Sequence, residues 1–122
     1  MERLITKILL IGFVAILGSC YYDSEEDLYP STGCNSTNMS YVTNIVPIIE
    51  RNCYACHSAA ANTANITLEG HSNIIVHVNS GRLVGAINHL PGFTPMPQGA
   101  SKLIACDLAK IEQWIADGAQ NN

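Results

Sequence analysis

The stretch RNCYACHSA, residues 51–59, places Cys53, Cys56 and His57 within five consecutive positions. A Cys-x-x-Cys pair alone is compatible with a redox dithiol, half of a zinc site or a local disulfide. A structural zinc site requires four ligands, usually as two spaced pairs, and the chain has no second Cys-x-x-Cys. A thioredoxin-like site requires a βαβ pattern near the pair, which this sequence lacks. A disulfide between Cys53 and Cys56 is the simplest alternative.

The adjacent histidine favours a different chemistry, because Cys-x-x-Cys-His is the attachment signature of c-type haem. Two thiols three positions apart lie on one helical turn, so both can form thioethers with the vinyl groups of a haem. The imidazole that follows then faces the iron. We therefore predict one haem c per chain, with Cys53 and Cys56 as attachment residues and His57 as the proximal ligand.

The iron needs a ligand on its other side, and Met96 is the candidate. It lies inside Pro-Met-Pro within LPGFTPMPQG, residues 90–99, where three prolines and two glycines exclude a helix or a central strand. A stiff, extended loop holds a thioether in place with little loss of entropy, and it is a poor position for a flexible core methionine. Met39 is expected to be linker or core. His89 stands as an alternative distal ligand.

The N-terminus has the pattern of a secretory signal. Residues 1–19 combine a charged start, an apolar run too short to span a bilayer, and small residues before a cut. Leu-Gly-Ser-Cys, residues 17–20, resembles the lipobox of bacterial lipoproteins, which implies cleavage before Cys20 and a diacylglycerol on its sulfur. We therefore expect an exported protein, lipid-anchored to a bacterial membrane and facing the periplasm or the cell surface. An ordinary signal peptide with a chance cysteine is the alternative.

Charge and composition separate a tether from a domain. The chain has 122 residues and a formal net charge of −4, and four acidic residues cluster directly after Cys20. Residues 20–33 are therefore expected to form an acidic flexible linker. A surface-export signal is the other interpretation. Residues 34–122 form one nearly neutral domain that gives no indication of nucleic-acid binding. A large apolar prosthetic group would help so short a domain to fold.

Two cysteines remain after these assignments, Cys34 and Cys106. Because unused cysteines tend to pair outside the cytoplasm, we predict a disulfide between them. It closes a loop of about seventy residues and is worth roughly 4 kcal/mol on the chain-entropy model. Two free thiols are the alternative.

Apolar periodicity predicts an all-α domain. Residues 39–53 have apolar positions at helical spacing, with Thr43 or Asn44 as the cap. Residues 71–81 and 82–89 each fit a short helix, although alternation over residues 75–78 also fits a strand. His71 and His77, in that region, are expected to be surface or loop residues. The last helix carries a stripe of apolar side chains with a tryptophan beside it, Leu108, Ile111, Ile115 and Trp114.

The order of these features resembles the monohaem class I c-type cytochromes over roughly residues 39–119. The resemblance implies a small cytochrome c-like fold of about three to five helices, with long loops wrapped around one covalent haem. It also implies His57 and Met96 as the axial ligands and Trp114 packed against the first helix. That family usually has a glycine and an aromatic residue on the first helix at this crossing, whereas this chain has Ile45, Ile48 and Ile49.

The resemblance implies a one-electron carrier and no enzyme, because two axial ligands leave the iron without an open position. We expect a membrane-associated redox partner, and the lack of a lysine-rich face argues against a strongly acidic one. Two other functions are open. One is a peroxidase-like haem enzyme in which Met96 leaves and His89 assists, and the other is a haem-free exported binding module held by disulfides.

Overall fold

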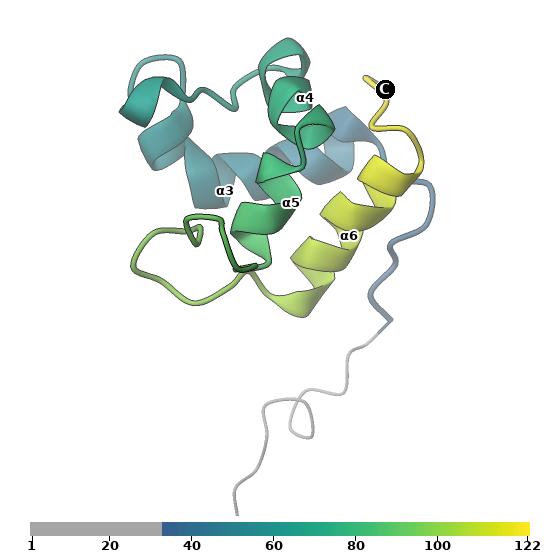
Figure 1. Cartoon of the computed structure of the whole chain (residues 1–122). Coiled ribbons are helices and arrows are strands. Elements are labelled where there is room, and N and C mark those ends of the chain that lie inside the picture. The colour runs from purple at the N-terminus through teal and green to yellow at the C-terminus, as the bar shows by residue number, and fades with distance from the viewer. Residues whose placement is uncertain (1–32) are drawn as a thin grey trace, which may run out of the picture. The chain divides into compact units, whose positions relative to one another are not determined.

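The structure is a computed structural model that describes residues 33–122. The predicted signal peptide, the predicted lipidation site Cys20 and nearly all of the predicted acidic linker lie outside the described residues. Within the described part, helices are joined by loops and no strand occurs, as Figure 1 shows. The all-α prediction is therefore confirmed for this part of the chain, and the strand considered for residues 75–78 is wrong because they lie in a helix.

The elements follow the order η1 (Tyr41–Ile45), α3 (Val46–His57), η2 (Thr63–Asn65), α4 (His71–Asn79), α5 (Arg82–Ile87) and α6 (Ala105–Ala116). The η1 element is a π-helical turn that runs directly into α3, and η2 is one short 3₁₀ turn. Residues Cys34–Asn122 form one compact unit. No helix in the described part is both long enough and apolar enough to cross a membrane.

The first helix begins earlier than its pattern predicts. Its cap is Ser40, and not Thr43 or Asn44, because the Ser40 hydroxyl accepts a hydrogen bond from the Thr43 backbone N–H at 3.4 Å. The Asn44 side chain accepts in return from the Ser40 N–H at 2.9 Å. This reciprocal pair satisfies two backbone donors that a helix start leaves free. Pro47 falls in the first turn of α3, where a missing N–H costs little.

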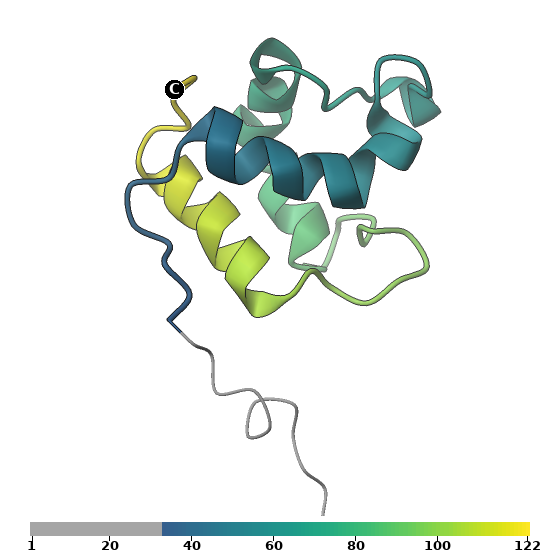
Figure 2. The ribbon, with the colours of Figure 1, turned by 180° about the vertical axis from the view of Figure 1, so that it is seen from behind.

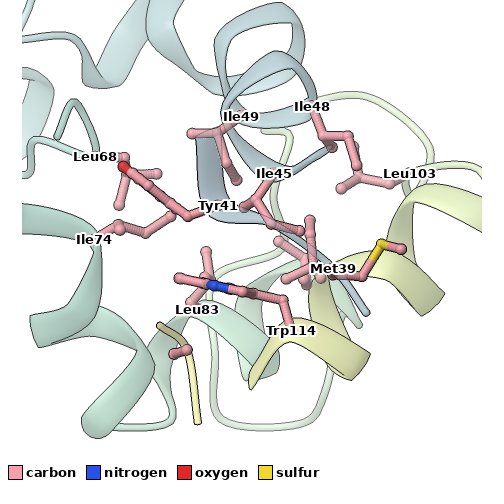
Figure 3. Close-up of a cluster of buried hydrophobic side chains, with 13 residues drawn as sticks. Met39, Tyr41, Ile45, Ile48, Ile49, Leu68, Ile74, Leu83, Leu103 and Trp114 are labelled. Carbon is pink, nitrogen blue, oxygen red and sulfur yellow. The ribbon is translucent and has the colours of Figure 1, made fainter. Parts of the chain in front are cut away.

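The hydrophobic core lies between the first helix, α4, α5 and α6 (Figure 3). Trp114 on α6 is 1% exposed and is among its largest buried side chains. Its ring stacks on Tyr41 in η1, with centroids 5.4 Å apart and an interplanar angle of 27°. Tyr41 therefore supplies the aromatic residue at the crossing of the first and last helices, a role that the sequence pattern does not assign to it. Met39 is buried in the same core.

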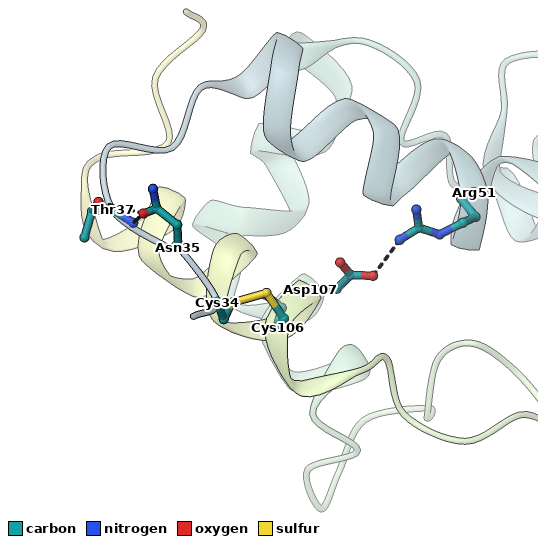
Figure 4. The surroundings of a disulfide bond; sticks show 6 residues. All are labelled: Cys34, Asn35, Thr37, Arg51, Cys106 and Asp107. Carbon is teal, nitrogen blue, oxygen red and sulfur yellow. Dashed lines mark hydrogen bonds and ion pairs between the residues drawn. A yellow bond between two sulfur atoms is a disulfide. The ribbon is translucent and has the colours of Figure 1, made fainter. Parts of the chain in front are cut away.

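Two interactions attach the start of α6 to the first helix (Figure 4). Cys34 and Cys106 form a disulfide with an S–S distance of 2.04 Å, which joins the segment before η1 to the first turn of α6. One residue further on, Asp107 is 8% exposed, and its Oδ2 lies 2.7 Å from Nη2 of Arg51 on α3. Together these contacts fix the first turn of α6 to the segment before η1 and to the middle of α3.

Candidate functional site

The three motif residues lie on the last two turns of α3. Cys53 is half-buried and packs against the core, whereas Cys56 is exposed, and both are free thiols. The disulfide considered between them is therefore not formed in this structure. Burial raises the pKa of Cys53 to about 11, because desolvation disfavours the thiolate. At neutral pH the structure therefore presents a half-buried neutral thiol and an exposed cysteine on the same turn.

His57 is held in a single tautomer. Its Nδ1 lies 3.1 Å from the carbonyl oxygen of Ile66. Since a carbonyl oxygen only accepts hydrogen bonds, Nδ1 carries the proton and Nε2 of the neutral ring keeps a free lone pair. The backbone N–H of Leu68 donates to the His57 carbonyl at 2.8 Å, so the returning loop fixes both the ring and the backbone. Metal-binding histidines are oriented in this way by a bond to the other ring nitrogen.

The two histidines of α4 differ from the expectation for surface or loop residues. His77 is half-buried, and its pKa is lowered first by burial and further by the nearby positive charge of Arg82. His71 lies edge-on to Tyr41, with ring centroids 5.0 Å apart, and its Nε2 is 2.7 Å from the Ala119 carbonyl oxygen. Both histidines differ from the expectation because α4 packs against the hydrophobic core. The short apolar run in its sequence fits either a helix or a strand, so it does not predict this packing.

Met96 is half-buried in the loop after α5, and its backbone is fixed on that helix. Its N–H donates to the Ala86 carbonyl at 3.0 Å. Its own carbonyl oxygen lies 3.0 Å from Nε2 of His89, which must donate. His89 thus contacts the backbone of Met96.

Gly85 explains how closely this loop approaches α5. A Cβ atom at this buried position would lie 2.5 Å from ring carbons of Phe93, a distance that real side chains do not adopt. The ring of Phe93 therefore rests on the backbone of the helix, and only glycine leaves the room. A lone glycine inside a helical pattern is a signal for such packing, although the sequence does not say what packs there.

The two halves of the predicted site lie on the same side of the molecule. Figures 1 and 2 show the C-terminal end of α3 and the loop between α5 and α6 on the side away from the chain's C-terminus. A surface hollow of about 460 Å³ lies nearby, between Arg51 and Asn52 on α3 and the segment from Pro97 to Asp107, and none of the four predicted site residues is part of its lining. The structure thus brings Cys53, Cys56 and His57 together on one helix end and holds Met96 on a separate element.

The chemistry of these donors fits a haem. In the part of the chain that the structure describes, no group of three or more His, Cys, Asp and Glu residues could hold a metal ion. An iron inside a porphyrin needs only two axial ligands from the protein. An imidazole with a free Nε2, a thioether on a fixed loop and two thiols on one turn meet that requirement.

Comparison with known proteins assigns no family. No family model matches the chain, and no curated protein or solved structure is detectably similar to it. Function must therefore be inferred from the chemistry of the residues themselves.

Proposed function

We propose that the protein is a one-electron carrier of the monohaem class I c-type cytochrome kind, with a cytochrome c-like fold. Cys53 and Cys56 attach the haem, and His57 and Met96 are its axial ligands. The observation that carries the proposal is the hydrogen bond from His57 Nδ1 to the Ile66 carbonyl. It leaves the Nε2 lone pair available for a metal, on the residue that directly follows the Cys53–Cys56 thiol pair. When bound, the haem iron supplies a reversible one-electron change between its ferric and ferrous states.

Each residue has a defined task in this proposal. Ile66 fixes the plane and tautomer of His57, so the ligand needs little reorganisation when the charge of the iron changes. Met96 closes the sixth position and favours the ferrous state, since a thioether raises the reduction potential relative to a second histidine. An iron with both positions filled exchanges electrons and does not bind substrate. The lipid on Cys20 would keep this carrier at a membrane, near a membrane-associated partner.

Met96→Ala tests the distal ligand. The haem is expected to stay covalently attached, while the methionine–iron absorption band is lost and cyanide binds readily to the ferric protein. The reduction potential is expected to fall by a sizeable fraction of the about 0.8 V over which axial ligands tune haem. The measurement is an absorbance spectrum of the oxidised and reduced mature protein with a potentiometric titration. Met39→Leu, at the buried core methionine, is the matched control and should keep the parent spectrum. An unchanged spectrum for Met96→Ala would refute the assignment.

The two stretches of chain that carry the proposed site are uncharged. Residues 52–68 and 83–101, which carry the motif and the methionine loop, contain no Asp, Glu, Lys or Arg. Leu90 and Phe93 on that loop are 46% and 38% exposed. We propose that the redox partner docks here through apolar and uncharged polar contacts, so that encounter is not steered by charge.

Leu90→Lys, at the more exposed of these two residues, tests the position of this face. If electrons pass near the loop, the added charge is expected to speed oxidation by the ferricyanide anion roughly three- to tenfold at low salt, and to slow reduction by the hexaammineruthenium(II) cation. Salt should remove both effects by screening. Val42→Lys adds the same charge at another exposed apolar residue, 59% exposed on η1, and should leave both rates within about twofold of the parent. Equal effects of the two variants in stopped-flow measurements would place electron exchange elsewhere.

The two alternative functions are distinguished by simple observations. A peroxidase-like enzyme, with a displaceable Met96 and His89 as its acid–base group, would bind peroxide or cyanide quickly at neutral pH. A haem-free binding module would show no covalent haem after production with the haem-attachment machinery.

A further inference from the structure

His89 lies at the C-terminal end of α5 and contacts the backbone of Met96, seven positions further along the chain. We propose that His89 is a positioning residue, which holds the Met96 thioether at the iron and is not itself an alternative ligand. This inference rests on the proposed function, since it concerns how the distal ligand is kept in place.

The side chain of His89 is already engaged. Its Nε2 lies 3.0 Å from the Met96 carbonyl oxygen. The oxygen can only accept, so Nε2 carries a proton and has no lone pair to offer a metal in this arrangement. The ring is half-buried, which strengthens the bond relative to one in water. In this geometry, Nε2 of His89 is therefore occupied by its hydrogen bond to the backbone of Met96.

The backbone of His89 aims the ring. Its N–H donates to the Ala86 carbonyl at 3.2 Å, and the Leu90 N–H donates to the Gly85 carbonyl at 2.9 Å. These two bonds form a Schellman motif, which needs a residue in the left-handed region, and His89 has φ of 54°. Glycine or asparagine is usual at this position. A histidine can meet the same backbone requirement and also reach the loop that returns after the turn.

Met96 is consequently fixed on both sides of its Cα atom. Its N–H donates to the Ala86 carbonyl, and its carbonyl oxygen accepts from the His89 ring. Both of its peptide groups are therefore hydrogen-bonded to the C-terminal end of α5. The ring of Phe93, in the same loop, packs on the backbone of Gly85 and adds a further contact between the loop and α5. Only the side-chain torsions of Met96 remain free. A ligand held in this way loses little entropy when it binds, and it competes well with small molecules from solution.

Two substitutions separate the backbone role of His89 from its side-chain role. His89→Asn keeps a residue that suits the left-handed cap, but its amide is too short to reach the Met96 carbonyl. His89→Gln places an amide N–H at about the reach of the imidazole Nε2. We expect His89→Asn to bind exogenous imidazole to the ferric iron about five- to tenfold more tightly than the parent, because one hydrogen bond to the distal loop is lost. His89→Gln should recover most of the parent affinity.

The experiment uses the full holoprotein and titrates ferric protein with imidazole while the methionine–iron band is followed. His71→Gln is the control, since His71 makes the same kind of ring–carbonyl contact, to Ala119 at 2.7 Å, away from the loop. Urea unfolding of each variant shows whether any change is merely a loss of global stability. Parent-like imidazole affinity in His89→Asn would overturn the inference and leave the proposed function intact. Loss of the native sixth ligand in both His89 variants, with Met96→Ala unchanged, would make His89 the ligand and also overturn it. Absence of covalent haem in the parent would overturn the proposed function together with the inference.

Discussion

Replacing Cys53 and Cys56 together with alanine is expected to abolish covalent haem attachment completely. Each thioether needs one cysteine sulfur, and alanine at both positions on this turn of α3 supplies none. His57 would keep its tautomer, because its hydrogen bond to the Ile66 carbonyl does not depend on the thiols, but coordination bonds alone do not hold a haem through denaturation. Intact-protein mass spectrometry and haem absorbance on a denaturing gel measure the result: the parent carries one haem and the double variant carries none.

The other cysteine pair provides a matched control for this result. The double variant Cys34→Ala/Cys106→Ala removes the same number of sulfurs from the same domain, but those sulfurs are already bonded to each other. It should therefore keep its covalent haem. Haem that stays attached to the Cys53→Ala/Cys56→Ala chain would contradict the assignment of the motif. Loss of haem in both double variants would show that folding, and not the identity of the thiols, limits attachment.

The sequence predicts the two outer helices well because their signals are local. Apolar spacing marks the first helix and the stripe that ends with Ile115 marks the last, and both form in the structure. The cap at Ser40 is missed because a π-helical turn moves the helix start before the periodic residues. Tyr41 is missed because its stacking on Trp114 depends on how the first and last helices cross, and helical spacing carries no information on that crossing.

The candidate site divides in the same way. A five-residue motif carries its own geometry, so the cysteines and His57 could be placed on one helix end from sequence. Proline on both sides of Met96 indicated a fixed loop, but nothing in the sequence indicated what fixes it. Ala86, His89 and Gly85 contact that loop only after α5 ends in a left-handed turn. Contacts of this kind arise from tertiary structure, and a linear pattern does not contain them.

The disulfide between Cys34 and Cys106 is expected to supply a large share of the stability of the domain. Its sequence separation is 72, so opening it releases a long loop in the unfolded chain. On the chain-entropy model, Cys34→Ala/Cys106→Ala should lower the free energy of unfolding by about 4 kcal/mol. Domains of this size have only about 5–15 kcal/mol in total. The fluorescence of Trp114, the single tryptophan, reports unfolding in a urea titration because the ring leaves its buried site.

The single variants distinguish loop entropy from local packing. Either Cys34→Ala or Cys106→Ala alone breaks the bridge, so each should cost nearly as much as the double variant, and the two losses should not add. If the stability came from packing of two separate side chains, the losses would sum. For a domain of this length, about 4 kcal/mol corresponds to a fall in Tm of roughly 15–30 °C. A double variant within about 1 kcal/mol of the parent would contradict the chain-entropy account. It would mean that the unfolded chain keeps residual structure that already restricts the same two ends.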